Sequence, residues 1–97
     1  MKLTSKQIKF LKSEAHHLKP IILMGANGLT EGVIVEIESA VAFHELVKVK
    51  LVSSDKETKD LIIDAILRET HSEFVQVVGN ILTLYKSSPE KKYNLPK

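Results

Sequence analysis

The chain of 97 residues contains no cysteine and no tryptophan, and only three prolines and four glycines. Without cysteine, a disulfide framework and a thiolate metal site are both excluded. No apolar run approaches the roughly 20 residues that a membrane-spanning helix requires. The N-terminal segment also lacks the apolar stretch of a secretory signal. We therefore expect a cytoplasmic protein without membrane contact.

The sequence motifs of enzymes and metal sites are also missing. The four histidines show no metal-ligand spacing, and Lys48 stands where an HExxH motif beginning at His44 would need its second histidine. The segment Gly25–Gly28 is neither a P-loop nor a GxGxxG dinucleotide fingerprint. No serine sits in a nucleophile elbow. We expect no enzyme, metal or cofactor, because a catalytic site would have to be assembled from residues without any motif.

Charge is distributed unevenly along a chain whose formal net charge is only +2. Residues 1–19 carry five lysines and one glutamate, and residues 86–97 carry four lysines and one glutamate, while the middle of the chain is acidic. Basic segments separated in this way favour a polyanionic partner. The simpler alternative is that lysine-rich ends only aid solubility.

Hydrophobic periodicity predicts one domain, 1–97, with the element order α-β-α-β-α-β-β. Helices are expected at 4–18, 29–43 and 54–71, and strands at 21–24, 46–51, 74–78 and 81–86. Ser54 and Glu57 match a capping box, and Gly79-Asn80 is typical of a type II′ hairpin. Residues 87–97 are expected to be a mobile basic tail.

This element order predicts an α/β two-layer sandwich with a mixed four-stranded sheet. Strands joined by helices should run parallel, and the last two should form an antiparallel hairpin. We expect the helices on one sheet face and the other face partly open. Within 46–51, Lys48 and Lys50 alternate with valines, so they should add positive charge to the open face.

The first helix is strongly amphipathic. On a helical wheel its apolar side holds Ile8, Leu11, Ala15 and Leu18, and its opposite side holds Lys2, Lys6, Lys9, Lys12 and His16. A solvated basic face is the simplest interpretation. The functional alternative is that these lysines lie along a phosphate backbone.

The segment Gly25–Gly28 links a short apolar strand to a helix that Thr30 can cap. A GxxG loop before a helix N-terminus can accept an anion such as a phosphate. A plain strand-to-helix turn is the simpler alternative. Glu31, in the first turn of that helix, would repel a phosphate bound there.

Five aromatic residues leave little material for base stacking, because Phe10 and Phe43 are expected in the core. An aromatic platform for single strands is therefore not expected. Structured RNA, contacted through its shape and phosphates, fits the residues better, although the residues alone do not separate RNA from DNA.

Several stretches together resemble the CRM domain, the chloroplast RNA splicing and ribosome maturation domain, in its stand-alone bacterial, YhbY-like form. They are Lys-Pro-Ile-Ile-Leu-Met-Gly-Ala-Asn-Gly-Leu-Thr-Glu-Gly-Val at 19–33, His-Glu-Leu-Val-Lys-Val-Lys-Leu at 44–51, and shorter matches at 57–59, 75–79, 84–86 and 95–97. The resemblance implies RNA binding, association with the precursor of the large ribosomal subunit, and a fold similar to the C-terminal domain of the third bacterial translation initiation factor.

By this resemblance the GxxG loop would contact RNA, as the GxxG loop of KH domains does. Ala26 and Asn27 leave the loop without the basic residue that such loops often carry, so flanking lysines would supply the charge. The expected RNA-binding set is Lys2, Lys6, Lys9, Lys12, Lys19, Gly25, Ala26, Asn27, Gly28, Lys48, Lys50 and Lys86. We expect a monomer that helps to assemble the ribosome. The alternative is a protein-interaction module that docks on a ribosomal protein through the acidic middle of the chain.

Overall fold

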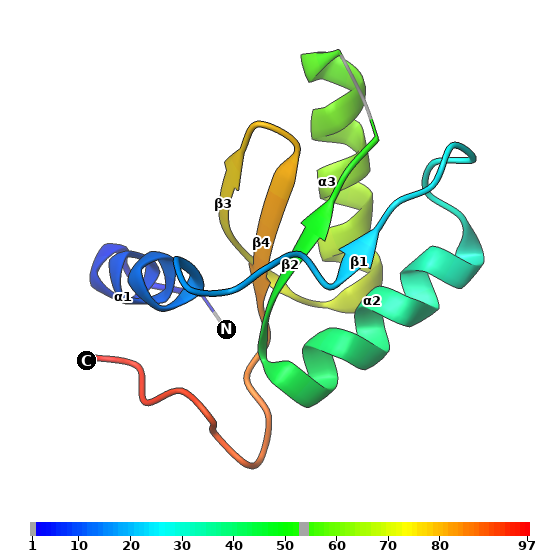
Figure 1. Ribbon diagram of the computed structural model, residues 1–97. Coiled ribbons are helices and arrows are strands. Elements are labelled where there is room, and N and C mark those ends of the chain that lie inside the picture. Colours follow the sequence, from blue (N-terminus) through cyan, green and yellow to red (C-terminus); the bar gives the residue numbers. More distant parts are fainter. Residues whose placement is uncertain (1, 53–54) are drawn as a thin grey trace.

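The computed structural model describes residues 2–52 and 55–97, and its elements follow the expected order (Figure 1). The helices are α1 (Ser5–Ala15), α2 (Glu31–His44) and α3 (Lys56–Thr70), and the strands are β1 (Ile22–Leu23), β2 (Leu46–Lys50), β3 (Glu73–Val78) and β4 (Ile81–Tyr85). Among the described residues, no helix has the length and apolar character needed to span a membrane.

Side chains cap the start of each helix. The N–H of Gln7 donates to the Thr4 hydroxyl at 3.1 Å while the Gln7 side chain accepts from the N–H of Thr4, which completes a capping box. The Thr30 hydroxyl accepts from the N–H of Val33 at 3.2 Å, as expected for α2. Asp55 caps α3, whereas the cap expected at Ser54 lies outside the described residues.

The sheet has the strand order β1-β2-β4-β3. The parallel pairing of β1 with β2 and the antiparallel hairpin of β3 and β4 confirm the expected mixed four-stranded sheet. Strand β4 also pairs antiparallel with β2 and therefore lies between β2 and β3. The two strands that α3 connects thus point the same way without being neighbours.

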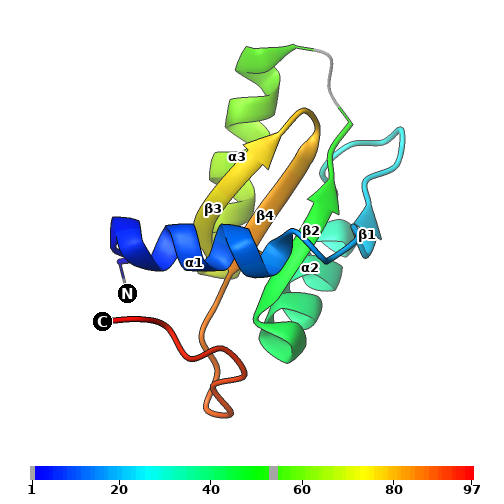
Figure 2. The ribbon, with the colours of Figure 1, turned by 60° about the vertical axis from the view of Figure 1, so that its left-hand side comes forward.

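Helices cover both faces of the sheet, although we expected them on one. Helices α2 and α3 pack on one face through Ile37, Val41, Ile63 and Ile66. Helix α1 crosses the other face and packs through Leu11 and Ala15 onto Leu46, Val75 and Tyr85 (Figure 2). The reason lies in the strands: neighbouring residues point to opposite faces, so an end of the sheet that is apolar throughout needs cover on both sides.

The C-terminal segment, expected to be a mobile tail, lies against the body of the protein. Tyr93 and Leu95 pack on the same apolar cluster as α1, and the Gln7 amide donates to the carbonyl oxygen of Pro96 at 3.0 Å. Leu3 and Ile8 belong to this cluster too, so the N-terminal and C-terminal segments meet there. The basic ends of the sequence are therefore neighbours in space.

The two phenylalanines expected in the core lie closer to solvent. Phe10 is half-buried beside the cluster under α1, and Phe43 is 65% exposed. The Lys92 ammonium lies 4.0 Å from the centre of the Phe43 ring and also donates to the carbonyl oxygen of Phe43. The exposed ring is thus part of the contact that holds the C-terminal segment, a cation–π interaction.

Candidate nucleic-acid interface

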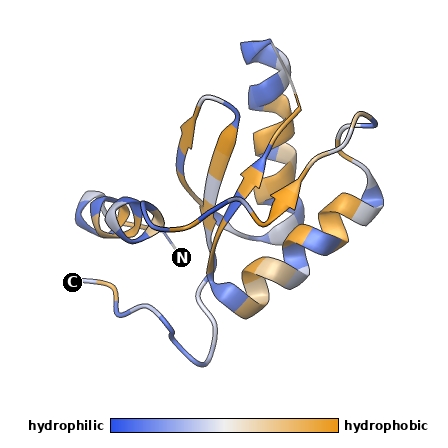
Figure 3. Cartoon of the chain, in the orientation of Figure 1, coloured by the Kyte–Doolittle hydropathy of each residue, from blue (hydrophilic) through white to orange (hydrophobic). Residues whose placement is uncertain are grey.

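Helix α1 covers only the end of its sheet face where β2 begins and β4 ends. Beyond α1 the strand register sets up two rows of side chains. Lys48, Thr83 and Gln76 form the first row, and Lys50, Ile81 and Val78 form the second. Residues paired across strands point to the same face, so Leu23, which pairs with Lys50, extends the second row. The hydropathy colouring shows the strands as largely hydrophobic with hydrophilic positions between (Figure 3).

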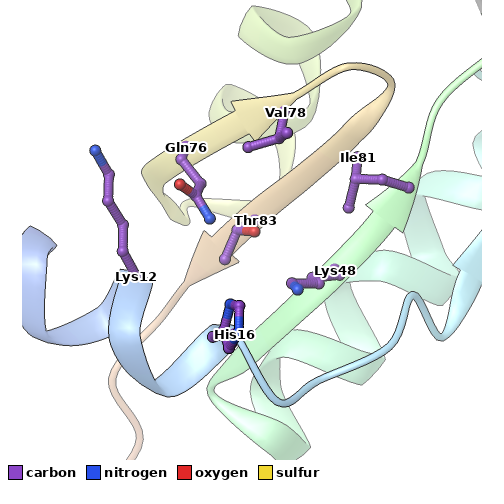
Figure 4. A pocket seen from close by; sticks show the side chains of 7 residues that line it. All are labelled: Lys12, His16, Lys48, Gln76, Val78, Ile81 and Thr83. Atoms are coloured by element: carbon purple, nitrogen blue, oxygen red, sulfur yellow. The ribbon is translucent and has the colours of Figure 1, made fainter.

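A hollow of about 260 Å³ lies where α1 meets this uncovered part of the sheet. It is lined by Lys12 and His16 from α1, Lys48 from β2, Gln76 and Val78 from β3, and Ile81 and Thr83 from β4 (Figure 4). Two lysines about 36 residues apart in sequence therefore line one hollow. The lining includes no carboxylate.

The lysines differ in how tightly their ammonium groups are held. Lys6, Lys9 and Lys12 are exposed along α1. Lys48 is half-buried, and its Nζ donates to the carbonyl oxygen of Leu18 at 3.0 Å, which ties β2 to the segment leaving α1. Lys50 is exposed on the same face. Together they make one basic surface from a helix and a strand.

The hydroxyl of Thr83 is a buried polar group without a hydrogen-bond partner in the part of the chain that the structure describes. The residue is 1% exposed, and its Oγ1 makes no hydrogen bond among the described residues. An unsatisfied buried hydroxyl is unfavourable, costing about 1–3 kcal/mol. Thr83 stands in the first row, between Lys48 and Gln76 (Figure 4).

The GxxG loop lies apart from α1, at the end of the edge strand β1 (Figures 1 and 2). The N–H of Gly28 donates to the carbonyl oxygen of Gly25 at 2.9 Å, so the loop is a tight turn. Of the two loop glycines, only Gly28 has a positive φ, +72°. A Cβ added at Gly25 or Gly28 would meet no atom within 4 Å, so the outer side of the loop is open.

The remaining expected residues lie around this surface or away from it. Lys2 and Lys19 are exposed and flank α1 at its two ends. Lys86 follows β4 at the end of the sheet remote from the hairpin, where its Nζ donates to the carbonyl oxygen of Thr70 at 3.1 Å. A lysine at a helix C-terminus satisfies a free carbonyl, so Lys86 acts here as a cap for α3.

Acidic residues gather on the opposite side of the sheet. Helix α2 carries Glu31, Glu36 and Glu38, and α3 carries Glu57, Asp60, Asp64 and Glu69 together with Lys56, Lys59 and Arg68, so seven acidic and three basic residues leave this layer with a net charge of −4. The sheet therefore separates an acidic helical layer from the basic surface. Within residues 2–52 and 55–97, no group of three or more His, Cys, Asp or Glu side chains is placed to hold a metal ion.

Four residues of the hollow were not identified from the sequence: Gln76, Val78, Ile81 and Thr83. The alternation of Ile81 and Thr83 with buried leucines was a usable signal, because it puts both on one face of β4. That β4 lies beside β2, and so beside Lys48, depends on strand order, which no local pattern encodes.

A family model, two relatives and one solved structure each match most of the chain. The model of the CRS1 / YhbY (CRM) domain matches residues 3–86. An "RNA-binding protein" of Haemophilus influenzae is 56% identical over 98% of this chain and 96% of its own length. The "Probable RNA-binding protein YqeI" of Bacillus subtilis is 40% identical over 93% of this chain and 94% of its own length. The solution structure of SAV1595 from Staphylococcus aureus has a TM-score of 0.84 at 34% identity, covering 97% of this chain and 99% of that one.

Proposed function

The chain belongs to the CRS1/YhbY (CRM) domain family, and on this basis we propose that it is an RNA-binding protein that associates with the precursor of the large ribosomal subunit and assists its assembly. Two relatives that cover nearly the whole chain carry RNA-binding in their names, which supports the RNA partner. The ribosomal role rests on the likeness to the family. The proposal includes no catalytic step and describes a cytoplasmic monomer.

The observation that carries the proposal is the basic surface made by α1 and the uncovered sheet face. Lys12 and Lys48 line the same hollow, and Lys6 and Lys9 continue the charge along α1. Ammonium groups attract phosphates over a distance set by salt, and each phosphate contact releases condensed counterions. RNA lying along this surface would meet Lys2 and Lys19 at its ends.

The GxxG loop would form a second contact. Gly25, Ala26 and Asn27 are exposed, and the open space around Gly25 and Gly28 leaves room for a sugar-phosphate backbone. Asn27 and free N–H groups are the available donors, since the loop holds no cation. Lys86, bound to the last turn of α3, lies outside the surface that we propose.

A charge-neutralising variant tests the basic surface. We expect Lys9→Gln with Lys12→Gln to weaken binding to a transcript of the precursor large-subunit ribosomal RNA and to lower the slope of log Kd against log salt by about 1–2. Filter binding across a salt series measures both quantities. Thermal unfolding should be unchanged, because both side chains are exposed.

The matched control is Lys56→Gln with Arg68→Gln on α3, which removes the same charge from the opposite layer. Lys56 pairs with Asp60 and Arg68 with Glu69, all at exposed positions, so stability should change little. If the control weakened binding as much as the α1 variant, only net charge would matter and the proposed surface would be wrong.

A second candidate is a module that docks on a ribosomal protein. It is favoured by exposed apolar residues in the acidic layer, Val35 and Leu61, beside carboxylates that would suit a basic partner. Nuclease treatment of a cell extract separates the two functions. Association with ribosomal particles that survives full RNA digestion would favour the protein partner, and its loss would favour RNA.

A further inference from the structure

We propose that the hollow between α1 and the sheet binds one unpaired nucleotide of the RNA, with its base on the uncovered sheet face. The proposal rests on the RNA-binding function proposed above and adds a specific ligand for one site. It differs from contact through phosphates alone, which needs only lysines. It assigns roles to residues of β3 and β4.

The aliphatic side chains provide a surface for the flat face of a base. Val78, which is 64% exposed, lies beside the half-buried Ile81 in the second cross-strand row, and Lys50 separates this pair from Leu23, which is 68% exposed. Large apolar side chains gathered on one exposed strip usually mark an interaction site. The strip lies beside cations, so its occupant should join an apolar face to negative charge, as a nucleotide does.

The polar groups of Thr83 and Gln76, in the first row, suit the edge of a base or a ribose hydroxyl. The Thr83 hydroxyl is buried and has no partner among the described residues. Gln76, which pairs with Thr83 across the strands, adds an amide that can both donate and accept. A bound nucleotide would satisfy a hydroxyl that the free protein leaves without a hydrogen bond.

Charge and size fit a nucleotide as well. Lys12 and Lys48 line the hollow from two sides, where they can meet the phosphates on either side of a bound base. The hollow of about 260 Å³ lies just below the usual range of pockets for drug-sized ligands, so it suits a single base. Bases in duplex RNA are stacked inside the helix. The base of an unpaired nucleotide can leave the stack and enter the hollow.

Two substitutions in the hollow test the proposal against one matched control. The variants are Thr83→Val, which replaces the hydroxyl with a methyl group, and Val78→Ser. The control is Val35→Ser, an equally polar change at a valine that is 58% exposed on α2. Filter binding to the precursor ribosomal RNA transcript is measured across a salt series, and thermal unfolding is measured without RNA.

We expect Thr83→Val and Val78→Ser each to lower RNA affinity about three- to tenfold, the value of one hydrogen bond or one lost apolar contact. The salt slope should stay at the wild-type value, because no phosphate contact is removed. The free Thr83→Val protein should unfold at or above the wild-type temperature, since an unsatisfied hydroxyl has gone. Val35→Ser should bind as the wild type does.

If Thr83→Val lowers RNA affinity but does not lower the unfolding temperature, a loss of structure does not explain the loss of binding. Wild-type affinity in both hollow variants would overturn the nucleotide site while leaving the RNA-binding function intact. Absence of RNA binding by the wild-type protein would instead overturn the proposed function. Equal losses in Val78→Ser and Val35→Ser would also reject the site.

Discussion

At the scale of single residues, Glu45 combines a positive φ with a buried carboxylate. It joins α2 to β2 with φ 68° and ψ −44°, a backbone conformation that is unfavourable for a residue with a Cβ. Its side chain is fully buried, yet it accepts hydrogen bonds from the Ser88 hydroxyl and from the N–H of Lys92 at 2.8 Å. These contacts attach the C-terminal segment to the body.

The Glu45 contacts predict a pH-dependent stability. Burial raises the pKa of this carboxyl group, but the Ser88 hydroxyl, the N–H groups of Lys92 and Tyr93 and the Lys92 charge outweigh it, so the pKa lies below its ordinary 4.5. A lowered pKa stabilises the folded protein above pH 4.5, and this stabilisation is lost as the pH falls below that value. We expect Glu45→Gln to be less stable than the wild type at pH 7 and the difference to shrink towards pH 3. Urea unfolding at several pH values measures it.

Glu38→Gln is the control for this prediction, because it removes the same charge from an exposed position of α2. At pH 7 its free energy of unfolding should stay within about 0.5 kcal/mol of the wild type. A constant difference between wild type and Glu45→Gln from pH 7 to pH 3 would contradict the assigned role of the Glu45 charge.

The two loop glycines predict different effects of the same substitution. Gly28→Ala forces a Cβ into a positive φ and should lower the free energy of unfolding by about 1–2 kcal/mol. Gly25→Ala has neither strain nor a close neighbour, so its stability should match the wild type. If the loop contacts an RNA backbone as proposed, Gly25→Ala should still weaken RNA binding. Chemical denaturation and filter binding on both variants check this, and unchanged binding by Gly25→Ala would remove Gly25 from the interface.

At the scale of elements, α1 both packs on the sheet and carries part of the basic surface. Its apolar side holds Leu11, fully buried against the sheet, and its polar side holds the exposed lysines. Because α1 lies on the face opposite to α2 and α3, it forms one wall of the hollow with Lys12 and His16. The position of the helix, and not only its amphipathic pattern, therefore brings its lysines next to Lys48.

Shortening a buried apolar side chain of α1 should lower the stability of the protein without changing its surface charge. We expect Leu11→Ala to lower the free energy of unfolding by about 2–5 kcal/mol, through lost apolar burial and a residual cavity. Ser13→Ala, at an exposed position of the same helix, should change it by less than about 0.5 kcal/mol. Urea denaturation measures both. Equal stability of the two variants would mean that α1 does not unfold together with the sheet.

At the scale of the whole molecule, the sheet divides the protein by charge. The acidic helices α2 and α3 lie on one side, and the basic α1 lies on the other. The C-terminal segment reaches α1 through Tyr93 and Leu95, so the basic ends come together on the α1 side. A net charge of only +2 therefore hides an uneven distribution of charge between the two sides of the sheet.

Removal of residues 88–97 should test how far the end of the chain supports this arrangement. The truncation takes away the partners of the Glu45 carboxylate and the half-buried Tyr93 and Leu95. We expect the free energy of unfolding to fall by about 2–4 kcal/mol, from lost burial and an unpaired buried charge. Calorimetry of the truncated and full-length proteins measures the loss. A truncated protein as stable as the full chain would show that these contacts contribute nothing.

Local patterns were enough to identify most elements. The 3.6-residue period of α1 and the alternation in β2 depend on neighbouring residues only, as do the Thr4 and Thr30 caps and the Gly79-Asn80 hairpin. The same local reasoning failed for Phe43, because its exposed ring is held by Lys92, a residue 49 positions away. It also failed for the C-terminal segment, which is held to the body by contacts with Gln7 and Glu45, residues distant in sequence.

The sequence by itself determined the element order, the mixed sheet and the separation of basic ends from an acidic middle, because periodicity and charge are properties of neighbouring residues. Only the tertiary structure decided that β4 lies between β2 and β3, that α1 crosses the opposite face, and that Lys12, Lys48 and Thr83 meet in one hollow. These features follow from burying both faces of the sheet at once, a requirement of the whole chain that no single segment contains.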